Sequence, residues 1–260
     1  MPVKKTPAAA AVGAPAANHT LVNGLRVLEA VSAECREFSV AELSVGLGLP
    51  KSHVHRLLRT LVESGYVAQS ADTHKYRSDF RLLALAGPMA EAMPLRVQGG
   101  PVLRALAQVT RSDAYLAVLH AGAPLIVMSD CYRGRASAHA LGVGMRLSRH
   151  ASAFGKLFLA VKRLPVKAEE LKRLTPATIT TVRGLNEELA AIRRQGFSVN
   201  RAENGAIFSF AAPVQAVTGE LLGAVGLAVE PALAARMGEE ALVTRVVEAA
   251  AALSERLAGA

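Results

Sequence analysis

The sequence predicts an α+β protein built from two parts, a small helical unit that carries one β-hairpin and a larger α/β domain. The first observation is a change of hydrophobic period along the 260 residues: helical spacing over 21–64 gives way to apolar, β-rich runs at 114–131 and 207–229. The second is the order of elements within 39–77, where two short helices come directly before a hairpin. Apolar residues make up 51% of the chain and charged residues 20%, which is enough apolar surface for two cores.

Helical spacing begins after a segment that has none. Residues 1–18 combine two lysines with an alanine run that prolines interrupt, and we expect a disordered arm there. A secretory signal would need the continuous Leu, Ile and Val stretch that this segment lacks. Leu21, Leu25, Leu28 and Val31 then recur every three or four residues, which predicts a helix with one apolar face.

The ends of the next two helices are marked by their capping residues. Ser39 and Glu42 have the spacing of a capping box, which predicts the start of a short helix. Pro50 suits the beginning of a second helix, which we expect to run to about Ser64. Gly65 can then adopt the left-handed conformation that ends a helix.

The remaining elements follow from the same signals. In chain order they are a hairpin that turns at 72–74, a short helix at 80–86 ended by Gly87 and Pro88, a helix at 95–110, strands at 114–120 and 125–131, helices at 152–161, 169–174 and 185–195, strands at 207–217 and 221–229, and a closing helix at 233–257. They divide the chain into a disordered arm (1–18), a winged helix-turn-helix (19–88), a linker helix (89–112) and a second domain (113–260).

A winged helix-turn-helix requires a second helix that buries one face and presents a polar, cationic face to the DNA major groove. Residues 50–64 meet this requirement, because apolar side chains repeat on one side and no acid lies between positions 51 and 62. The candidate DNA contacts are Lys51, Ser52, His53, His55, Arg56 and Arg59 on this helix and Lys75 and Arg77 on the hairpin. The alternative is a solvated helix face beside a structural hairpin, and the helix lengths together with the hairpin favour DNA binding.

Net charge does not locate the DNA surface. The chain carries 30 Lys and Arg against 21 Asp and Glu, which gives a formal charge of +9. Residues 1–90 hold ten basic and seven acidic side chains, so most of the excess lies outside the segment assigned to DNA. Aromatic residues are 4% of the chain and Trp is absent, which disfavours a stacking platform for single-stranded nucleic acid.

Other classes of protein lack their sequence signatures here. No stretch approaches the roughly 18 apolar residues of a membrane span, and Cys35 and Cys131 are too few for a disulfide framework, so we expect a cytoplasmic protein. A nucleophile elbow and a P-loop are missing, and we expect no catalytic residue and no cofactor. His139 and His150 lack tight metal-ligand spacing with Cys131, and we expect a neutral, hydrogen-bonded His150. Two alternatives stay open: an enzyme for a small acid with an appended helix-turn-helix, and a protein-interaction module.

Three collinear segments resemble the IclR-type bacterial transcriptional regulators. They are 40–67, which contains Lys51-Ser52-His53-Val54-His55-Arg56; 144–156, which contains His150-Ala151-Ser152-Ala153-Phe154-Gly155-Lys156; and 196–199 together with Ala211-Ala212-Pro213-Val214. The resemblance implies a winged helix, an effector-binding domain similar to the GAF fold, and dimers that often pair into tetramers. It also implies that a small molecule, commonly an organic acid, controls binding to double-stranded DNA. The helices at 21–31 and 95–110 are the expected contacts between copies.

The resemblance also implies positions for an effector pocket. These are Ala136, His139, Ala153, Phe154, Asn200, Glu203, Ser209, Gly226 and Ala228. Ser209 stands where a cysteine is common in the family, Gly226 and Ala228 stand where serines are frequent, and His53 replaces a small hydroxyl residue. Because this lining has few side-chain donors, we expect an aromatic or short apolar carboxylate, held by backbone N–H groups at the helix start near 152–154 and by His139.

Overall fold

The computed structural model describes residues 18–34, 36–132 and 141–259, and the chain divides into two compact units, Met1–Pro88 and Met89–Ala260. The arm expected at the N-terminus therefore lies outside the described residues, except for Asn18, whose side chain accepts a hydrogen bond from the Leu21 amide and caps the first helix. None of the helices in the described part of the chain combines the length and apolar character that crossing a membrane requires.

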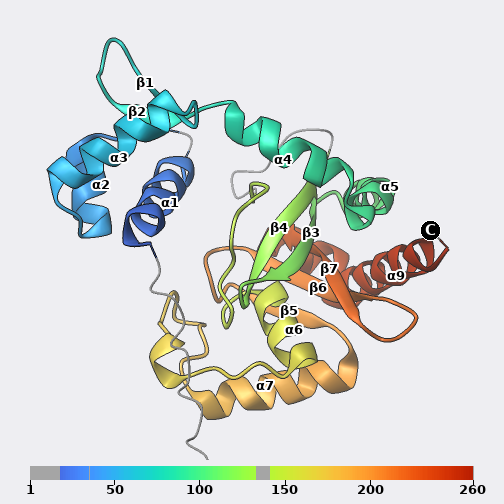
Figure 1. Cartoon of the computed structure of the whole chain (residues 1–260). Helices are drawn as coiled ribbons and strands as arrows, with labels where there is room; N and C mark the ends of the chain where they lie inside the picture. Colours follow the sequence, from blue (N-terminus) through green and yellow to red (C-terminus); the bar gives the residue numbers. More distant parts are fainter. Residues whose placement is uncertain (1–17, 35, 133–140, 260) are drawn as a thin grey trace, which may run out of the picture. The chain divides into compact units, whose positions relative to one another are not determined.

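The first unit is a winged helix-turn-helix, as the sequence predicts. Its elements are α1 (His19–Ser32), α2 (Val40–Leu47), α3 (Lys51–Glu63), β1 (Val67–Gln69) and β2 (Tyr76–Ser78) (Figure 1). The apolar stripes of the helices pack together with the hairpin around a core of Val27, Val31, Phe38, Leu43, Val54, Leu57, Leu58, Val67 and Tyr76. Backbone hydrogen bonds between Phe38 and Tyr76 join the hairpin to the segment before α2.

The predicted capping box begins α2. The Glu42 amide donates to Ser39 Oγ at 3.2 Å, and the Glu42 carboxylate accepts from the Ser39 amide at 2.7 Å. These bonds satisfy N–H groups that the first turn of a helix would otherwise leave unpaired. Hydrogen bonds from Ser39 and from Arg36 lower the pKa of Glu42 to about 2.

Helix α4 (Arg81–Glu91) continues through Gly87 and Pro88, where the sequence predicts its end. Proline removes one backbone donor and normally clashes with the Cβ of the residue before it. Gly87 has no Cβ, so this one of the clashes that proline makes is absent where α4 passes Pro88. None of the α4 side chains is buried within the described structure.

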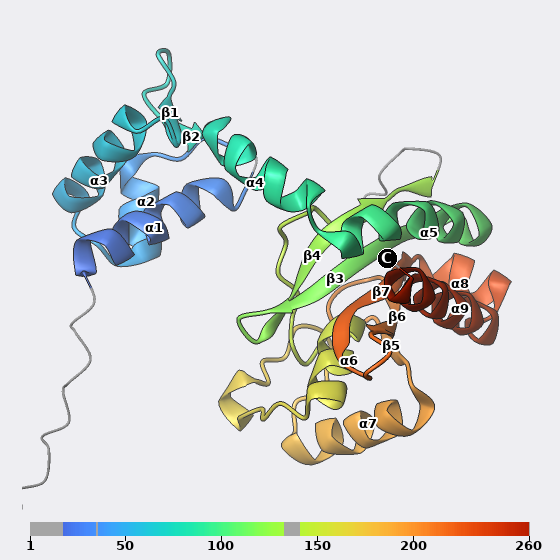
Figure 2. The ribbon, with the colours of Figure 1, turned by 45° about the vertical axis from the view of Figure 1, so that its right-hand side comes forward.

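The second unit is a five-stranded antiparallel sheet with helices on both faces (Figure 2). The strand order is β4-β3-β7-β6-β5, formed by β3 (Asp113–His120), β4 (Ala123–Asp130), β5 (Ser198–Arg201), β6 (Phe208–Gln215) and β7 (Leu221–Val229). Helices α5 (Pro94–Thr110) and α9 (Glu239–Ala258) share one hydrophobic core with the sheet, and α6 (Ala153–Lys162) and α7 (Val182–Gln195) share the other. The predicted α+β class is confirmed.

Most of the linker helix expected at 89–112 is helix α5, which is part of the second unit. Leu103 is 0% exposed and Leu106 3% exposed, and both pack in the same core as α9. Because its apolar face is buried in the core of the second unit, α5 belongs to that unit and is not a linker between the two units.

Three further elements differ from the sequence prediction. Strand β5 was not predicted, because four residues directly after a helix cap are too few to show a period of two. The helix expected at 169–174 is a single 3-10 turn, η2 (Ala168–Glu170). The closing helix is divided into α8 (Pro231–Met237) and α9 by Gly238, whose φ of 83° no helical residue adopts.

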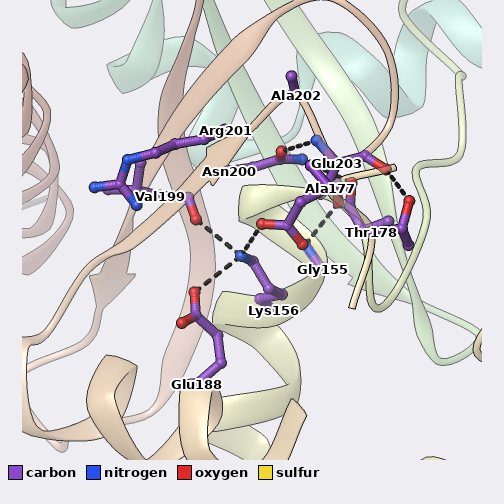
Figure 3. A network of polar contacts seen from close by, with 12 residues as sticks. Gly155, Lys156, Ala177, Thr178, Glu188, Val199, Asn200, Arg201, Ala202 and Glu203 are labelled. Carbon is purple, nitrogen blue, oxygen red and sulfur yellow. Dashed lines mark hydrogen bonds and ion pairs between the residues drawn. The ribbon is translucent and has the colours of Figure 1, made fainter. Parts of the chain in front are cut away.

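A buried ammonium joins the elements on the α6 side of the sheet (Figure 3). The Lys156 side chain is 1% exposed, and its Nζ lies 2.5 Å from a Glu203 oxygen, 2.9 Å from a Glu188 oxygen and 2.9 Å from the Val199 carbonyl oxygen. An ammonium has three donors, so Lys156 is saturated by α7, by β5 and by the turn that follows β5. The second Glu203 oxygen is buried and has no hydrogen-bond partner among the described residues.

We expect the Glu42→Gln variant to remove a pH-dependent part of the stability of the first unit. The folded-state pKa of Glu42 is about 2, below its ordinary value of 4.5, so ionised Glu42 stabilises the fold above pH 4.5 and this contribution disappears as the pH falls toward 2. Urea denaturation, followed by NMR signals of α2 residues, should show wild type more stable than the variant at pH 6 and a gap that closes by pH 2. A gap that stays constant over this range would contradict the assignment.

Lys156→Met should destabilise the second unit by about 3–5 kcal/mol, because it leaves two carboxylates beside each other without their counter-charge. Urea denaturation at pH 7 measures this cost. The matched control is Arg183→Ala, which breaks the exposed Arg183–Glu187 pair on α7 and should cost no more than about 0.5 kcal/mol. Equal costs for the two variants would show that the buried ammonium is not a structural centre.

Candidate functional site

The exposed face of α3 brings most of the predicted DNA contacts together. Helical spacing places Ser52, His55, Arg56 and Arg59 on the side opposite the buried stripe, and all four are exposed. Lys51, at the first position of the helix, is exposed as well. The face therefore offers donors at the spacing that contacts with phosphates and base edges require.

Two side chains on this face have partners within the protein. Arg59 Nε lies 3.2 Å from a Glu63 oxygen, and both side chains are more than half exposed, so this ion pair is weak. His53 is half-buried, and its Nδ1 lies 3.1 Å from Arg56 Nη2. The His53 Nε2 lies 3.4 Å from Asn23 Nδ2 on α1. His53 therefore contacts its own protein through both ring nitrogens, in place of the free position expected for a base contact.

The hairpin presents its two predicted cations to solvent. Lys75 and Arg77 are exposed on the strand that returns from the turn. Thr73 Oγ1 donates to a Glu37 oxygen at 2.6 Å, which attaches the turn to the segment before α2. His74 has a φ of 54°, and its carbonyl accepts from Gln69 Nε2 at 3.0 Å. These bonds shape the turn that carries Lys75.

A cavity of about 80 Å³ lies in the second unit, between the start of α6 and strands β3, β6 and β7. It is lined by Tyr115, Leu141, Leu147, Ser152, Phe154, Asn200, Asn204, Ile207, Ser209, Leu227 and Ala228. One water molecule occupies about 10–15 Å³ by the same measure, so the space admits a small organic molecule. Leu and Ile side chains with Phe154 make most of the wall apolar.

Four of the predicted effector positions line this cavity: Phe154, Asn200, Ser209 and Ala228. Ala153 and Glu203 are buried next to it but do not line it, and Glu203 is the partner of Lys156. Ala136 and His139 lie outside the described residues, as does Cys35.

Gly226 shapes the cavity without lining it. A Cβ at this position would lie 2.3 Å from the Phe210 carbonyl oxygen and 2.6 Å from Phe154 Cζ. The absence of a side chain therefore lets the Phe154 ring lie directly against β7. Gly226 is not among the residues that line the cavity, so its contribution to the cavity comes through the position of the Phe154 ring.

Most polar groups around the cavity are already hydrogen-bonded within the protein. Asn200 donates from Nδ2 to the Ala151 carbonyl oxygen at 2.7 Å and accepts at Oδ1 from the Glu203 amide at 2.8 Å. Ser152 Oγ accepts from the Gly155 amide at 3.0 Å and caps α6. The Tyr115 hydroxyl accepts from the Leu141 amide at 3.1 Å. Burial raises the pKa of Tyr115 well above its ordinary value, so the phenol stays neutral.

The groups left for a ligand are few. The Asn204 amide, the Ser209 hydroxyl and the backbone N–H groups of Ala153 and Phe154 have no hydrogen-bond partner among the described residues. The two backbone groups belong to the first turn of α6, where N–H groups point away from the helix and favour negative charge. The cavity therefore combines an apolar wall with few free donors, and Asn204, Ser209 and Phe154 are the lining residues that carry them.

Sequence reasoning missed six lining residues: Tyr115, Leu141, Leu147, Asn204, Ile207 and Leu227. Tyr115 lies opposite Gly226, and Ser209 lies opposite Ala228, in the registers of the three central strands. A period of two marks which residues share a face, but the pairing of β3 with β7 joins segments about 110 residues apart in the chain and has no local sequence signal.

Metal chemistry finds no support among the described residues, where no three His, Cys, Asp or Glu side chains gather in a way that could hold an ion. His150 Nε2 lies 3.0 Å from the Lys172 carbonyl oxygen, which agrees with the expected structural role. Burial raises the pKa of the Cys131 thiol, so this cysteine is a weak nucleophile at neutral pH.

Two family models match the chain. The model described as bacterial transcriptional regulator IclR C-terminal covers residues 88–255, and the IclR helix-turn-helix domain covers residues 20–71. Together they span both units. They agree with the winged helix-turn-helix and with the α/β fold seen in the structure.

Relatives agree over most of their length. The chain is 29% identical over 259 residues to the DNA-binding transcriptional repressor YiaJ of Escherichia coli (strain K12), covering 94% of this chain and 89% of the relative. It is 31% identical over 228 residues to the glycerol operon regulatory protein of Streptomyces griseus, covering 85% and 89%. An IclR homologue from Microbacterium hydrocarbonoxydans, solved in complex with 4-hydroxybenzoate, has 26% identity and a TM-score of 0.75, covering 93% and 100%. These matches show that the chain belongs to the IclR family of bacterial transcriptional regulators.

Proposed function

We propose that the first unit binds an operator in double-stranded DNA through α3 and the hairpin, and that the second unit binds an aromatic or apolar carboxylate that controls this binding. The observation that carries the proposal is the exposed, acid-free face of α3 on a winged helix-turn-helix, in a chain that also holds a small, mostly apolar cavity. We further propose that the protein acts in the cytoplasm and catalyses no reaction.

The DNA contacts divide by position. Arg56 and Ser52 lie at the centre of the exposed face of α3, where a helix in the major groove meets base edges. Lys75 and Arg77 belong to the hairpin and not to the helix that enters the major groove, so they suit the phosphate backbone. The α3 contacts should therefore select sequence, while the hairpin contacts should add affinity.

The class of effector follows from the cavity. Its apolar wall favours a flat, apolar body, because burial of an unpaired hydroxyl group would cost free energy. The free N–H groups at the start of α6 and the donors of Asn204 and Ser209 suit a carboxylate. The 4-hydroxybenzoate bound by the Microbacterium homologue is a molecule of this class.

Self-association is expected because one recognition helix covers half an operator, and a two-fold dimer covers both halves. Apolar side chains without cover are found on α1 and α4: Leu21 is 61% exposed, Leu25 51%, Leu83 68% and Met89 69%. Helix α5, the other expected contact, buries most of its apolar side chains in its own unit, and Val97 and Val109 are exposed on its outer side. We propose that α1 and α4 form the contact between copies.

The second candidate, an enzyme acting on a small acid, requires a base and a nucleophile within reach of each other. The free groups of the cavity in the described part of the chain are amide, hydroxyl and backbone donors, and none of them is a general base. Turnover of a bound carboxylate, detected by chromatography after incubation with the protein, would favour the enzyme.

Replacing Arg56 should affect DNA binding differently from replacing Lys75. On duplex DNA from upstream of the protein's own gene, Arg56→Ala should cost about 1–3 kcal/mol and reduce the preference over random DNA. Lys75→Ala should weaken both DNAs alike and lower the salt slope by about one. Fluorescence anisotropy over a range of salt concentrations measures both. Native affinity of Arg56→Ala at every salt concentration would refute the assignment.

Thermal-shift measurements test the effector class. Benzoate or 4-hydroxybenzoate at 100 times its Kd should stabilise the protein by about 2.7 kcal/mol, a rise of several degrees in Tm. Ser209→Leu fills the cavity and should abolish the rise, while Ser254→Ala, a change on α9 away from the cavity, should keep it. Stabilisation by gluconate and by none of the apolar acids would show that the argument from the cavity wall is wrong.

A further inference from the structure

His53 lies between the buried and the exposed sides of α3. It is three residues before Arg56, so the two side chains are neighbours on the helix surface. Its ring is half-buried, with Nδ1 at 3.1 Å from Arg56 Nη2 and Nε2 at 3.4 Å from Asn23 Nδ2. Asn23 Oδ1 in turn accepts from Arg26 Nη1 at 3.3 Å, and Arg26 Nη2 donates to the Leu47 carbonyl oxygen at 3.1 Å.

The chemistry of the pair defines the role of each atom. A guanidinium can only donate, so Nδ1 of His53 must accept from Arg56. A neutral imidazole keeps one N–H, which the ring must then carry at Nε2. Nε2 therefore offers a donor, and the Asn23 amide accepts it only when its oxygen is turned toward the ring; in that orientation Asn23 no longer accepts from Arg26.

The partners of the two arginines on this face differ in charge. Arg59 is paired with the Glu63 carboxylate, which offsets its charge and would repel a phosphate. Arg56 is held by a neutral ring nitrogen, so it keeps its full charge and its remaining N–H donors for DNA. A flexible arginine that is already held in place also loses less conformational entropy on binding.

We propose that His53 is a positioning residue that holds the Arg56 guanidinium for its contact with a base, and that it does not contact a base itself. The proposal rests on the proposed DNA contact of Arg56. It predicts that the base pairs selected through Arg56 depend on His53. Loss of one immobilised side chain corresponds to an effect on the order of 3- to 10-fold in Kd.

Substitutions at position 53 distinguish the role of Nδ1 from the role of Nε2. In His53→Asn the side-chain oxygen takes the place of Nδ1 and can accept from Arg56, while in His53→Gln the amide reaches the place of Nε2 instead. Selection from a random duplex library with the wild-type chain defines the preferred sequence, and anisotropy on it and on single-base variants measures each protein. We expect His53→Ala and His53→Gln to lose about 3- to 10-fold on the preferred sequence, and His53→Asn to stay close to wild type.

A double-mutant cycle tests the dependence on Arg56. His53→Ala should have no further effect in an Arg56→Ala chain, whereas it should keep its full effect in an Arg59→Ala chain. Full additivity with Arg56→Ala, a change in preference at base pairs that Arg56→Ala does not affect, or failure of His53→Asn to restore binding would each overturn the proposal. Wild type that selects no duplex would instead refute the DNA-binding function, and unchanged binding by Arg56→Ala would refute the Arg56 contact.

A measurement without DNA completes the test. In the free protein, the ¹⁵N NMR signals of the His53 ring should show Nδ1 without a proton and the ring proton on Nε2, and the Nδ1 signal should shift in Arg56→Ala. An Nδ1-protonated ring, or an Nδ1 signal that ignores the Arg56 substitution, would show that the contact does not hold the guanidinium.

Discussion

The buried ammonium of Lys156 is the interaction on which the second unit depends most. Its three donors have three acceptors, from α7, β5 and the turn after β5, so none of these elements can shift without leaving a charge unpaired. Glu203 is fixed by this contact, and its amide in turn holds Asn200, which lines the cavity. Asn204, the next residue, carries one of the free donors. The shape of the cavity is therefore set by an ion pair that does not touch it.

Most polar groups next to the cavity are hydrogen-bonded within the protein, so few donors and acceptors remain for a ligand. Two of the polar positions implied by family resemblance are paired within the fold: Asn200 through both atoms of its amide, and Glu203 through one carboxylate oxygen. A group that is paired inside the fold cannot turn to a ligand without leaving its partner unsatisfied, which costs more than the new bond gains. Selectivity must then come from shape, from the start of α6 and from the two side chains that stay free.

Local signals predicted the first unit almost completely, because helix periods and caps act within a few residues. The α3 stripe and the capping box at Ser39 were both readable in this way. The second unit depends on contacts between distant segments, so its fold class was readable but its cavity was only partly so. Tyr115 enters the cavity through the pairing of β3 with β7, and α4 passes Pro88 because of its neighbour Gly87. Neither outcome has a periodic signature.

Gly226 and Ala228 on β7 are both small residues, but they have opposite effects on the space available to a ligand. Ala228 lines the cavity and leaves room for a ligand, whereas the space left by Gly226 is taken by the ring of Phe154. A serine at Gly226 would clash with the Phe210 carbonyl oxygen at 2.3 Å and with Phe154 Cζ at 2.6 Å, so both the neighbouring strand and the ring would have to move. The ring is thus seated against the sheet, and the cavity beside it has a volume of about 80 Å³. A ligand that fits this space must be small, and the apolar wall favours an apolar body, so both features lead to the same class of molecule.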